Sequence, residues 1–264
     1  MPILLTIAGY DPSSGAGVTA DLQVMAAHGH FGISCITSLT VQSTLGVEAS
    51  HPVDPAVVRH TLGCLARDLP PAGIKLGMLA TAQQVHAVAD WLQALPLAHG
   101  RPVVLDPVLY SSSGRQLLSD EGLDVLRQRL LPLVTWTTPN LDEAAVLADL
   151  PVGSAGQMLE AAQRLRERYP QLGVVVTGGH LEPPDDLVVT SEGDSHWLVG
   201  TRIDSQSTHG TGCAFSTALA CRLVSGHSAA EAAAGAKQYV AQAIQRAPGL
   251  GHGKGPLELL WPLR

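Results

Sequence analysis

The stretch Gly210-Thr211-Gly212-Cys213 is the part of this chain whose residue types and spacing point most directly to chemistry. Residues 214–223, which follow it, are predicted to form a helix. A glycine turn at a helix N-terminus lets successive backbone N–H groups converge on one point. The helix dipole adds positive potential there, so such turns bind anions. A thiolate is also best tolerated at this position of a helix. The pattern indicates an anion hole beside an activated thiol, which phosphoryl transfer or acyl transfer would need.

Acyl transfer by a cysteine requires a histidine and a further group that orients it. His209 is the histidine nearest to Cys213 in the sequence, and no nucleophile-elbow pattern surrounds that cysteine. The sequence therefore favours phosphoryl transfer over acyl transfer.

The charge of the chain limits the partners that such a site could serve. Sixteen Lys and Arg against 23 Asp and Glu give a formal net charge of −7 over 264 residues, and no basic run occurs. This balance argues against nucleic acid and anionic membranes as partners. A bound phosphate must then be held by local backbone amides and a few placed cations.

Cysteine usage and hydropathy indicate a protein of a reducing compartment. The four cysteines show neither C-x-x-C spacing nor pairing with histidine, so no zinc site is expected. The first residues lack the basic segment of a signal peptide, and no apolar run approaches the roughly 18 residues that span a bilayer. We expect a cytoplasmic protein that makes no membrane contact.

Short apolar runs alternate with helical patterns along the chain, as in a mostly parallel sheet covered by helices on both faces. The predicted strands are residues 3–8, 33–39, 73–76, 103–106, 133–137 and 173–177. Residues 186–190 and 196–199 are predicted to form a β-hairpin. No repeat or linker divides the chain, so residues 1–264 are expected to form a single α/β domain.

Several helices have recognisable starts. Asp54-Pro55 supplies an N-cap and a proline at the first helical position. Three further pairs have the spacing of a capping box: Thr81 with Gln84, Ser154 with Gln157, and Ser228 with Glu231.

Ligands of open α/β sheets bind outside the carboxyl ends of the strands, and several polar residues fall there. Asp106 ends a buried apolar run, where a carboxylate is costly unless it is paired or near a metal. A turn role before Pro107 would also explain it. Asn140 and Glu143 fit a helix cap, although Glu143 could also stand, through water, beside a phosphate bound to Mg²⁺.

The loop 9–17 after the first predicted strand is rich in glycine but matches neither of the common phosphate-binding patterns. It could be a plain turn that feeds a helix. Its exposed backbone would also suit the wall of a pocket for a small flat molecule, with Asp21 nearby on the following helix. Gln42 and Met78 are individually unremarkable, since a methionine near a strand end is usually part of the core.

Several segments, in the same order along nearly the whole chain, resemble the hydroxymethylpyrimidine/phosphomethylpyrimidine kinases of thiamine biosynthesis. These kinases are a branch of the ribokinase-like superfamily. The segments that carry the resemblance are 6–17 with 20–22, 36–47, 75–79, 104–108, 138–141, 178–181 and 209–213. The resemblance implies a ribokinase-like three-layer α/β/α sandwich with a mostly parallel central sheet, ATP as phosphoryl donor, Mg²⁺ and a homodimer.

The resemblance also implies which residues contact the substrate. These are Gly9, Asp21, Gln42 and Met78, and the Gln42 amide would hydrogen-bond the aminopyrimidine while the glycine loop packs on the ring.

Roles at the reacting group follow from the same resemblance. Gly210, Thr211 and Gly212 would form the anion hole together with Cys213. Cys213 takes the position that most of the superfamily fills with Asp, and its thiolate would accept the proton of the alcohol.

The cofactors would be held by a further set of residues. Asp106 and Glu143 would bind the metal, and the nucleotide would contact Asn140, Thr177, Thr211 and Lys237.

Two departures from the family pattern keep alternatives open. Thr177 and Ser112 stand where the family commonly has lysines near phosphates, with Lys237 and Lys254 as potential substitutes. A non-catalytic protein that binds the pyrimidine would explain these losses. A pyridoxal kinase is the other alternative, although Gln42 favours an aminopyrimidine.

Overall fold

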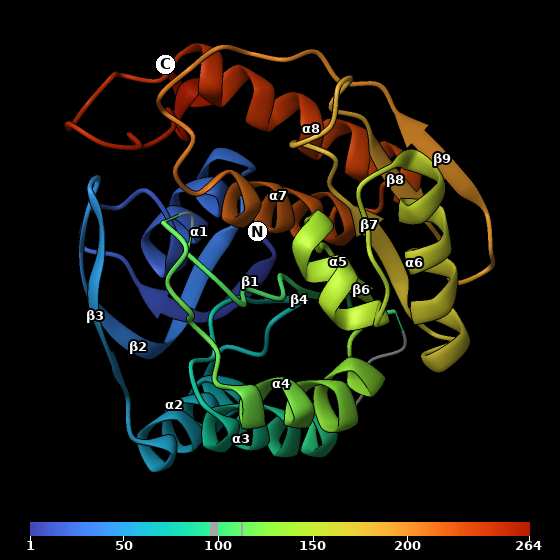
Figure 1. Ribbon diagram of the computed structural model, residues 1–264. Helices are drawn as coiled ribbons and strands as arrows, with labels where there is room; N and C mark the ends of the chain where they lie inside the picture. Colours follow the sequence, from blue (N-terminus) through green and yellow to red (C-terminus); the bar gives the residue numbers. More distant parts are fainter. Residues whose placement is uncertain (96–99, 112) are drawn as a thin grey trace.

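The computed structural model describes residues 1–95, 100–111 and 113–264, and its strands form one sheet (Figure 1). The sheet has the order β3-β2-β1-β4-β5-β6-β7-β8-β9. The strands are β1 (Ile3–Tyr10), β2 (Phe31–Ser43), β3 (Gly46–Pro52), β4 (Gly73–Leu76), β5 (Val103–Leu105), β6 (Trp136–Thr137), β7 (Gly173–Val176), β8 (Asp186–Val189) and β9 (Ser195–Leu198). The central strands β2, β1, β4, β5, β6 and β7 run parallel, and β3, β8 and β9 add antiparallel edges.

Helices cover both faces of this sheet, which gives three layers (Figure 1). They are α1 (Gly17–Ala27), α2 (Pro55–Asp68), α3 (Ala82–Ala94), α4 (Asp120–Val125), α5 (Leu141–Ala148), α6 (Ala155–Arg168), α7 (Thr211–Val224) and α8 (Ala229–Gln245). Helices α1, α7 and α8 pack on one face, and α2 to α6 pack on the other. Side chains of β1 alternate between the two cores: Leu4 faces α1 and α7, whereas Leu5 and Ile7 face the opposite layer. The predicted three-layer sandwich is therefore confirmed.

Three strands differ most from the sequence prediction. Strand β2 runs from Phe31 to Ser43 and so extends beyond the predicted residues 33–39 at both ends. Strand β3 was not predicted, because this edge strand is half exposed and carries few apolar residues. Strand β6 is shorter than predicted, since residues Leu131–Leu133, which include a proline, form a 3₁₀ turn before it. No helix within the described ranges is long and apolar enough to cross a bilayer.

Most of the predicted helix starts are confirmed. The Asp54 side chain caps α2, and Ser228 with Glu231 forms a complete capping box on α8. Ser154 caps α6, but the Gln157 side chain accepts from Gly153 rather than from the Ser154 N–H.

The predicted capping box at Thr81 is wrong. Thr81 precedes α3 without a side-chain capping bond. Gln84 is fully buried and donates instead to the backbone carbonyls of Thr37 and Val53. Tertiary contacts with β2 thus replace the local bond that the spacing suggested.

A buried ion pair lies at the centre of the molecule, below the N-terminus of α7. Lys75 Nζ lies 2.9 Å from Asp21 Oδ2, and neither side chain is exposed. The hydroxyls of Thr6 and Thr217 also donate to the Asp21 carboxylate. These contacts join β1, α1, β4 and α7, so a single carboxylate holds four elements together.

We predict that Asp21→Asn destabilises the fold strongly, because it leaves the Lys75 ammonium buried without a counter-charge. Removal of one partner of a buried pair costs about 3–5 kcal/mol. The matched control is Asp90→Asn, which breaks an exposed pair with Arg129 and should cost less than about 1 kcal/mol. Chemical denaturation of both variants measures the difference. Equal losses of unfolding free energy would contradict this assignment.

Candidate active site

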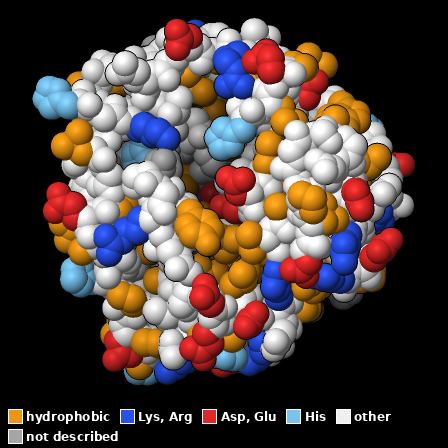
Figure 2. Space-filling model, in the orientation of Figure 1, with side chains coloured by type: hydrophobic (Ala, Val, Ile, Leu, Met, Phe, Trp, Pro, Cys, Tyr) orange, Lys and Arg blue, Asp and Glu red, His pale blue; other side chains and the backbone are white. Residues whose placement is uncertain are grey.

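A large cavity opens at the carboxyl ends of the parallel strands (Figure 2). Its volume is about 1770 Å³, well above the roughly 300–1000 Å³ of a single small-ligand pocket. Strand β1 has β2 on one side and β4 on the other, so the strand order reverses at β1. Ligands of open sheets bind at such switch points. The cavity therefore has room for two small ligands at the expected edge of the sheet.

The N-terminus of α7 forms one wall of the cavity, as the sequence predicted. Gly210 has φ of +82°, and a Cβ there would lie 1.8 Å from the carbonyl oxygen of Gly15. Only glycine fits this position. The N–H groups of Thr211, Gly212 and Cys213 precede the first intrahelical bond, which Ala214 donates to Gly210. The N–H groups at this end of α7 thus have no acceptor inside the helix.

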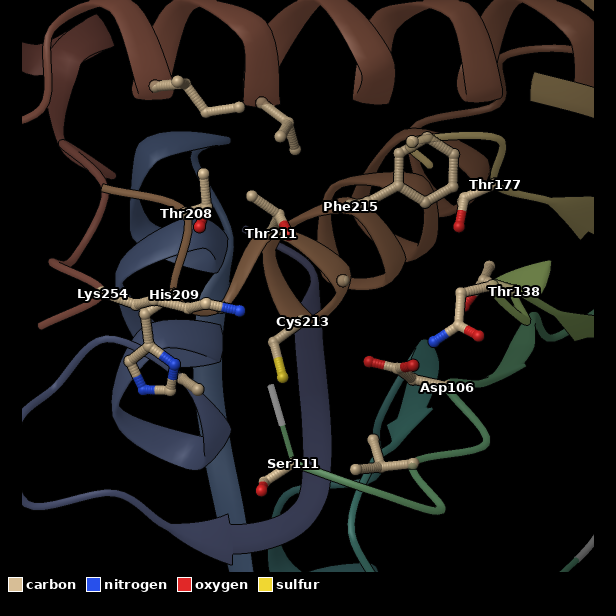
Figure 3. Close-up of a pocket in the computed structure, with 18 of the residues that line it drawn as sticks. Asp106, Ser111, Thr138, Thr177, Thr208, His209, Thr211, Cys213, Phe215 and Lys254 are labelled. Atoms are coloured by element: carbon tan, nitrogen blue, oxygen red, sulfur yellow. The ribbon is translucent and has the colours of Figure 1, made fainter. Parts of the chain in front are cut away.

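Cys213 lies in the cavity, but its electrostatic state differs from the prediction. Figure 3 shows the sulfur between His209 on one side and Asp106 on the other. Burial raises the pKa of the thiol to about 12, although the charge of Lys75 acts against the shift. The sequence-based expectation that the helix end would favour a thiolate is therefore wrong for the ligand-free chain. Desolvation is the main cause of this rise in the thiol pKa, and the charges of Asp106 and Asp21 add to it.

Asp106 faces the cavity across from α7. Its carboxylate accepts a hydrogen bond from Ser216 Oγ at 3.2 Å, and the nearby Cys213 thiol helps to hold down the pKa of this carboxyl. Burial raises the pKa of this carboxyl, and Lys75 opposes the rise. The side chain thus belongs to the site and does more than shape the turn before Pro107.

Glu143 combines the two roles that the sequence left open. It forms a complete capping box with Asn140 at the start of α5. Burial raises its pKa to about 8, and the charge of Asp106 adds to the rise. The two carboxylates therefore repel each other at one end of the cavity.

This pair of carboxylates fits the predicted magnesium site. A divalent cation would relieve their repulsion, and Mg²⁺ is usually held by one or two carboxylates together with water and phosphate oxygens. Within the described ranges no group of three or more His, Cys, Asp or Glu is placed to hold a metal alone. The hydroxyl of Thr138, beside Asp106 in Figure 3, is buried and has no hydrogen-bond partner. The donor set therefore suits a cation that arrives with a ligand.

Three of the four predicted substrate residues line the cavity. Gly9, Gln42 and Met78 lie in its wall, and a Cβ at Gly9 would approach the Met78 sulfur to 3.0 Å. The absence of a side chain at Gly9 thus keeps this wall flat. The fourth prediction, Asp21, is wrong as a direct contact. Asp21 is fully buried below the cavity, and its carboxylate forms an ion pair with Lys75.

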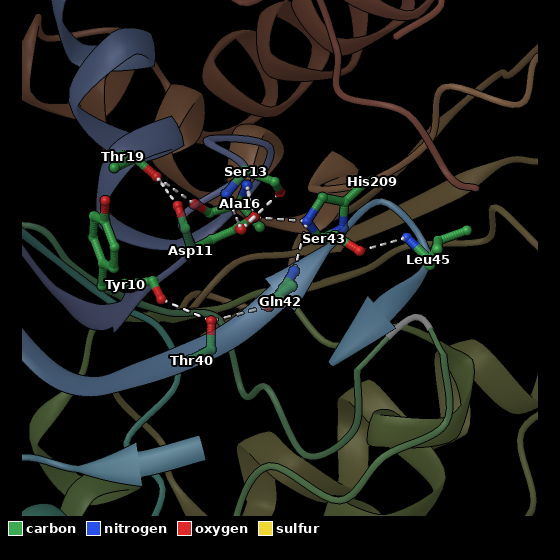
Figure 4. Close-up of polar contacts among 10 residues, drawn as sticks. All are labelled: Tyr10, Asp11, Ser13, Ala16, Thr19, Thr40, Gln42, Ser43, Leu45 and His209. Atoms are coloured by element: carbon green, nitrogen blue, oxygen red, sulfur yellow. Dashed lines mark hydrogen bonds and ion pairs between the residues drawn. The ribbon is translucent and has the colours of Figure 1, made fainter. Parts of the chain in front are cut away.

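A polar network that was not predicted ties the glycine loop to Gln42 (Figure 4). His209 Nε2 lies 2.7 Å from Asp11 Oδ2 and 2.9 Å from the Gln42 amide. Asp11 also accepts from the Ser13 N–H, the Ser13 hydroxyl and the Ala16 N–H. Burial alone would raise the pKa of Asp11, but the bonds from His209 and Ser13 lower it below its usual value. The carboxylate is therefore ionised.

The predicted nucleotide residues meet on the opposite side of the cavity. Asn140 and Thr177 lie on adjacent chain segments in its wall. Lys237 also reaches the cavity, where its ammonium lies 2.8 Å from Asp186 and donates to the Pro184 carbonyl. Its charge is thus partly offset by Asp186. Ser112, the other position that departs from the family pattern, lies outside the described residues.

Sequence reasoning missed two residues of this site besides Asp11 and His209. Lys75 is the one charged side chain in the otherwise apolar strand β4, and Thr138 precedes the Pro139-Asn140 turn. A lysine inside a short buried strand was the available signal, because such a residue needs a buried partner.

The fold and the cavity are those of a ribokinase-like kinase of small molecules, and comparison with known proteins defines the family. The family model described as phosphomethylpyrimidine kinase matches residues 11–258. The hydroxymethylpyrimidine/phosphomethylpyrimidine kinase of Streptomyces coelicolor is 37% identical over 99% of this chain and 96% of its own length. The thiamine biosynthesis bifunctional protein ThiED of Geobacter sulfurreducens is 40% identical, and the chain spans 51% of its length. The chain belongs to the phosphomethylpyrimidine kinase family.

Solved structures agree with this assignment. Phosphomethylpyrimidine kinase (thiD) of Clostridium difficile superposes with a TM-score of 0.79 and 30% identity over 92% of this chain and 100% of its own. Pyridoxal kinase of Bacillus subtilis, in an ADP complex, superposes with a TM-score of 0.88 and 30% identity over the full length of both chains. The expected class of enzyme, a phosphotransferase of thiamine biosynthesis with a ribokinase-like fold, is confirmed.

The pKa of Glu143 gives a prediction for the pH dependence of stability. Its folded value of about 8 lies above the ordinary value of 4.5, so its contribution to stability is complete below pH 4.5 and is lost as pH rises through 8. The unfolding free energy of the ligand-free chain should fall over this range relative to Glu143→Gln, by a few kcal/mol at about 1.4 kcal/mol per pKa unit. Denaturation at several pH values measures it.

The control for this experiment is Glu231→Gln, which changes the exposed capping box of α8. Hydrogen bonds from Ser228 lower the pKa of Glu231, so its contribution is lost as pH falls, in the opposite direction. A parallel pH profile for the native chain and Glu143→Gln would contradict the assignment of Glu143.

Proposed function

We propose that this chain transfers the γ-phosphoryl group of ATP to the hydroxymethyl group of 4-amino-5-hydroxymethyl-2-methylpyrimidine, to the monophosphate of that alcohol, or to both. One observation carries the proposal: the N-terminus of α7, with Cys213, faces Asp106 and Glu143 across a single cavity. An anion site opposite a carboxylate pair is the arrangement that phosphoryl transfer needs, since the transfer depends on positioning and charge stabilisation.

The two ligands would occupy opposite sides of the cavity. Gly9 and Met78 offer a flat wall to the pyrimidine ring, and Gln42 offers amide hydrogen bonds. Asn140 and Thr177 line the other side, where we place the nucleotide. The reacting hydroxyl would then lie between them, beside α7.

The phosphoryl group in transit would be held by the N–H groups of Thr211, Gly212 and Cys213. Asp106 directly, and Glu143 through water, would hold Mg²⁺, whose charge would offset that of the phosphates.

The proton of the alcohol would pass to Cys213 Sγ as the new O–P bond forms. The thiol is protonated in the ligand-free chain, so its own proton must leave. It would leave to water as the nucleotide and its cation bind, because a positive charge beside Asp106 and the N–H groups at the end of α7 both favour the thiolate. The buried ammonium of Lys75 would stabilise the negative charge of Cys213 and Asp106 throughout.

The structural comparison gives the second candidate, a pyridoxal kinase. A pyridoxal kinase superposes with the higher TM-score, 0.88 against 0.79. The family model and the relative from Streptomyces coelicolor favour the pyrimidine instead, so we expect the purified chain to consume ATP with the pyrimidine alcohol or its monophosphate faster than with pyridoxal. A coupled assay of ADP release on all three compounds measures this. Faster turnover of pyridoxal would favour the second candidate. Pyrimidine binding without ATP affinity in calorimetry would favour a non-catalytic protein.

Cys213→Ala should reduce turnover by about 100-fold or more, the usual contribution of a group that moves a proton. Binding of the pyrimidine, measured by calorimetry, should change less than about threefold, because the thiol acts on the reacting proton. Cys64→Ala, which alters an exposed thiol, is the control. If turnover of Cys213→Ala stays near that of the native chain, the proposed role of the thiol is wrong.

We further propose that the enzyme is a cytoplasmic homodimer. Leu39 and Val41 on β2 are about half exposed (49% and 47%), which supports an apolar contact between copies. The cysteines within the described ranges are all free, which supports a reducing compartment. Sedimentation measures the oligomeric state.

A further inference from the structure

The hydrogen-bond partners of the Gln42 side chain restrict which way its amide can point. Its two neighbours, His209 and Thr40, each already donate their proton to another acceptor. The amide nitrogen lies 2.9 Å from His209 Nε2, and the amide oxygen lies 3.3 Å from Thr40 Oγ1. The two ends of a carboxamide have nearly the same shape, so their hydrogen-bond partners decide which end is the oxygen.

The His209 end requires an acceptor. Asp11 is ionised and can only accept, and it lies 2.7 Å from His209 Nε2, so this nitrogen must carry a proton. An imidazole nitrogen binds one proton at most, whether the ring is neutral or charged. A second donor facing the same nitrogen would be unsatisfied, whereas an oxygen could share its proton.

The Thr40 end requires a donor, for an independent reason. Thr40 Oγ1 has a single proton, and the Tyr10 carbonyl accepts it at 2.9 Å. The hydroxyl can then only accept from Gln42. Both ends of the amide therefore demand the same arrangement, with oxygen toward His209 and nitrogen toward Thr40.

We propose that His209, held by Asp11, and Thr40, held by Tyr10, lock the Gln42 amide in this orientation and thereby select the aminopyrimidine over pyridoxal. The inference rests on the proposed function. His209 and Thr40 are positioning residues, since they act through Gln42.

The selectivity follows from the chemistry of the two rings. The aminopyrimidine carries a ring nitrogen that accepts directly beside an amino group that donates, and a carboxamide can bond both. In pyridoxal the ring nitrogen and the ring hydroxyl are separated by a methyl-bearing carbon, so one amide cannot bond both. An amide with a fixed orientation also admits the pyrimidine in one sense only, with its hydroxymethyl group toward Cys213. A freely turning amide would accept the ring turned over as well.

The test is the ratio of kcat/KM for the pyrimidine alcohol to that for pyridoxal. His209→Leu should lower this ratio about tenfold, the range of one to two neutral hydrogen bonds, through a rise in the KM of the pyrimidine. Thr40→Val should lower it in the same direction. His209→Gln can donate one proton to Asp11 and another to Gln42, so it should keep the ratio within about threefold of the native value.

The control variant is Ser13→Ala, which removes a bond to Asp11 but leaves His209 in place. Its ratio should be unchanged. A general disturbance of the anion hole would lower kcat for both substrates equally and leave the ratio as it was. An unchanged ratio in both His209→Leu and Thr40→Val would overturn the inference.

The same ratio can be read from binding alone, by calorimetry with each compound in the absence of ATP. A chain that binds the pyrimidine with the expected dependence on His209, yet does not turn it over, would contradict the proposed function and support the inference. Turnover of the pyrimidine with no dependence on His209 or Thr40 would support the function and contradict the inference.

Discussion

The buried ion pair between Asp21 and Lys75 is the interaction on which the geometry of the site depends. It lies directly below the N-terminus of α7 and joins that helix to α1 and to the strands β1 and β4. An unpaired charge in this core would be costly, so the four elements are held in a fixed relation. The same ammonium acts electrostatically on both Cys213 and Asp106. The Lys75 ammonium therefore both stabilises the fold and sets the electrostatics of the site.

The site is short of positive charge, and this deficit explains the state of its side chains. Burial and mutual repulsion raise the pKa values of Cys213 and Glu143 in a chain whose net charge is already −7. Backbone N–H groups at α7 can hold a phosphate without adding a cation. Under the proposed function, the carboxylates would favour a cation that arrives with the nucleotide.

Local sequence signals predicted what local interactions determine. The bounds of β4 and the capping boxes of α5 and α8 follow from neighbouring residues, and the structure confirms them. Helix α7 begins at Thr211, three residues before the predicted start. The errors come from tertiary burial. Gln84 is drawn into the core and does not cap α3, Asp21 is satisfied by a lysine 54 residues away, and the thiol of Cys213 is desolvated.

The network of Asp11, His209 and Gln42 escaped sequence reasoning for a related reason. Its members are separated by up to 198 residues, and no spacing rule connects them. The family resemblance supplied Gln42 as a substrate contact but not the groups that orient it. Contacts of this range become visible only when the topology brings the loop after β1, strand β2 and the turn before α7 to one edge of the sheet.

The central claim of the account is that the transferred phosphoryl group is held by the N–H groups of Thr211 to Cys213. A crystal structure with ADP, Mg²⁺, fluoroaluminate and the pyrimidine alcohol tests this claim most directly. We expect the fluoroaluminate within hydrogen-bond distance of those groups, with the hydroxymethyl oxygen in line beside the Cys213 sulfur. A fluoroaluminate held elsewhere in the cavity, away from the end of α7, would contradict the account.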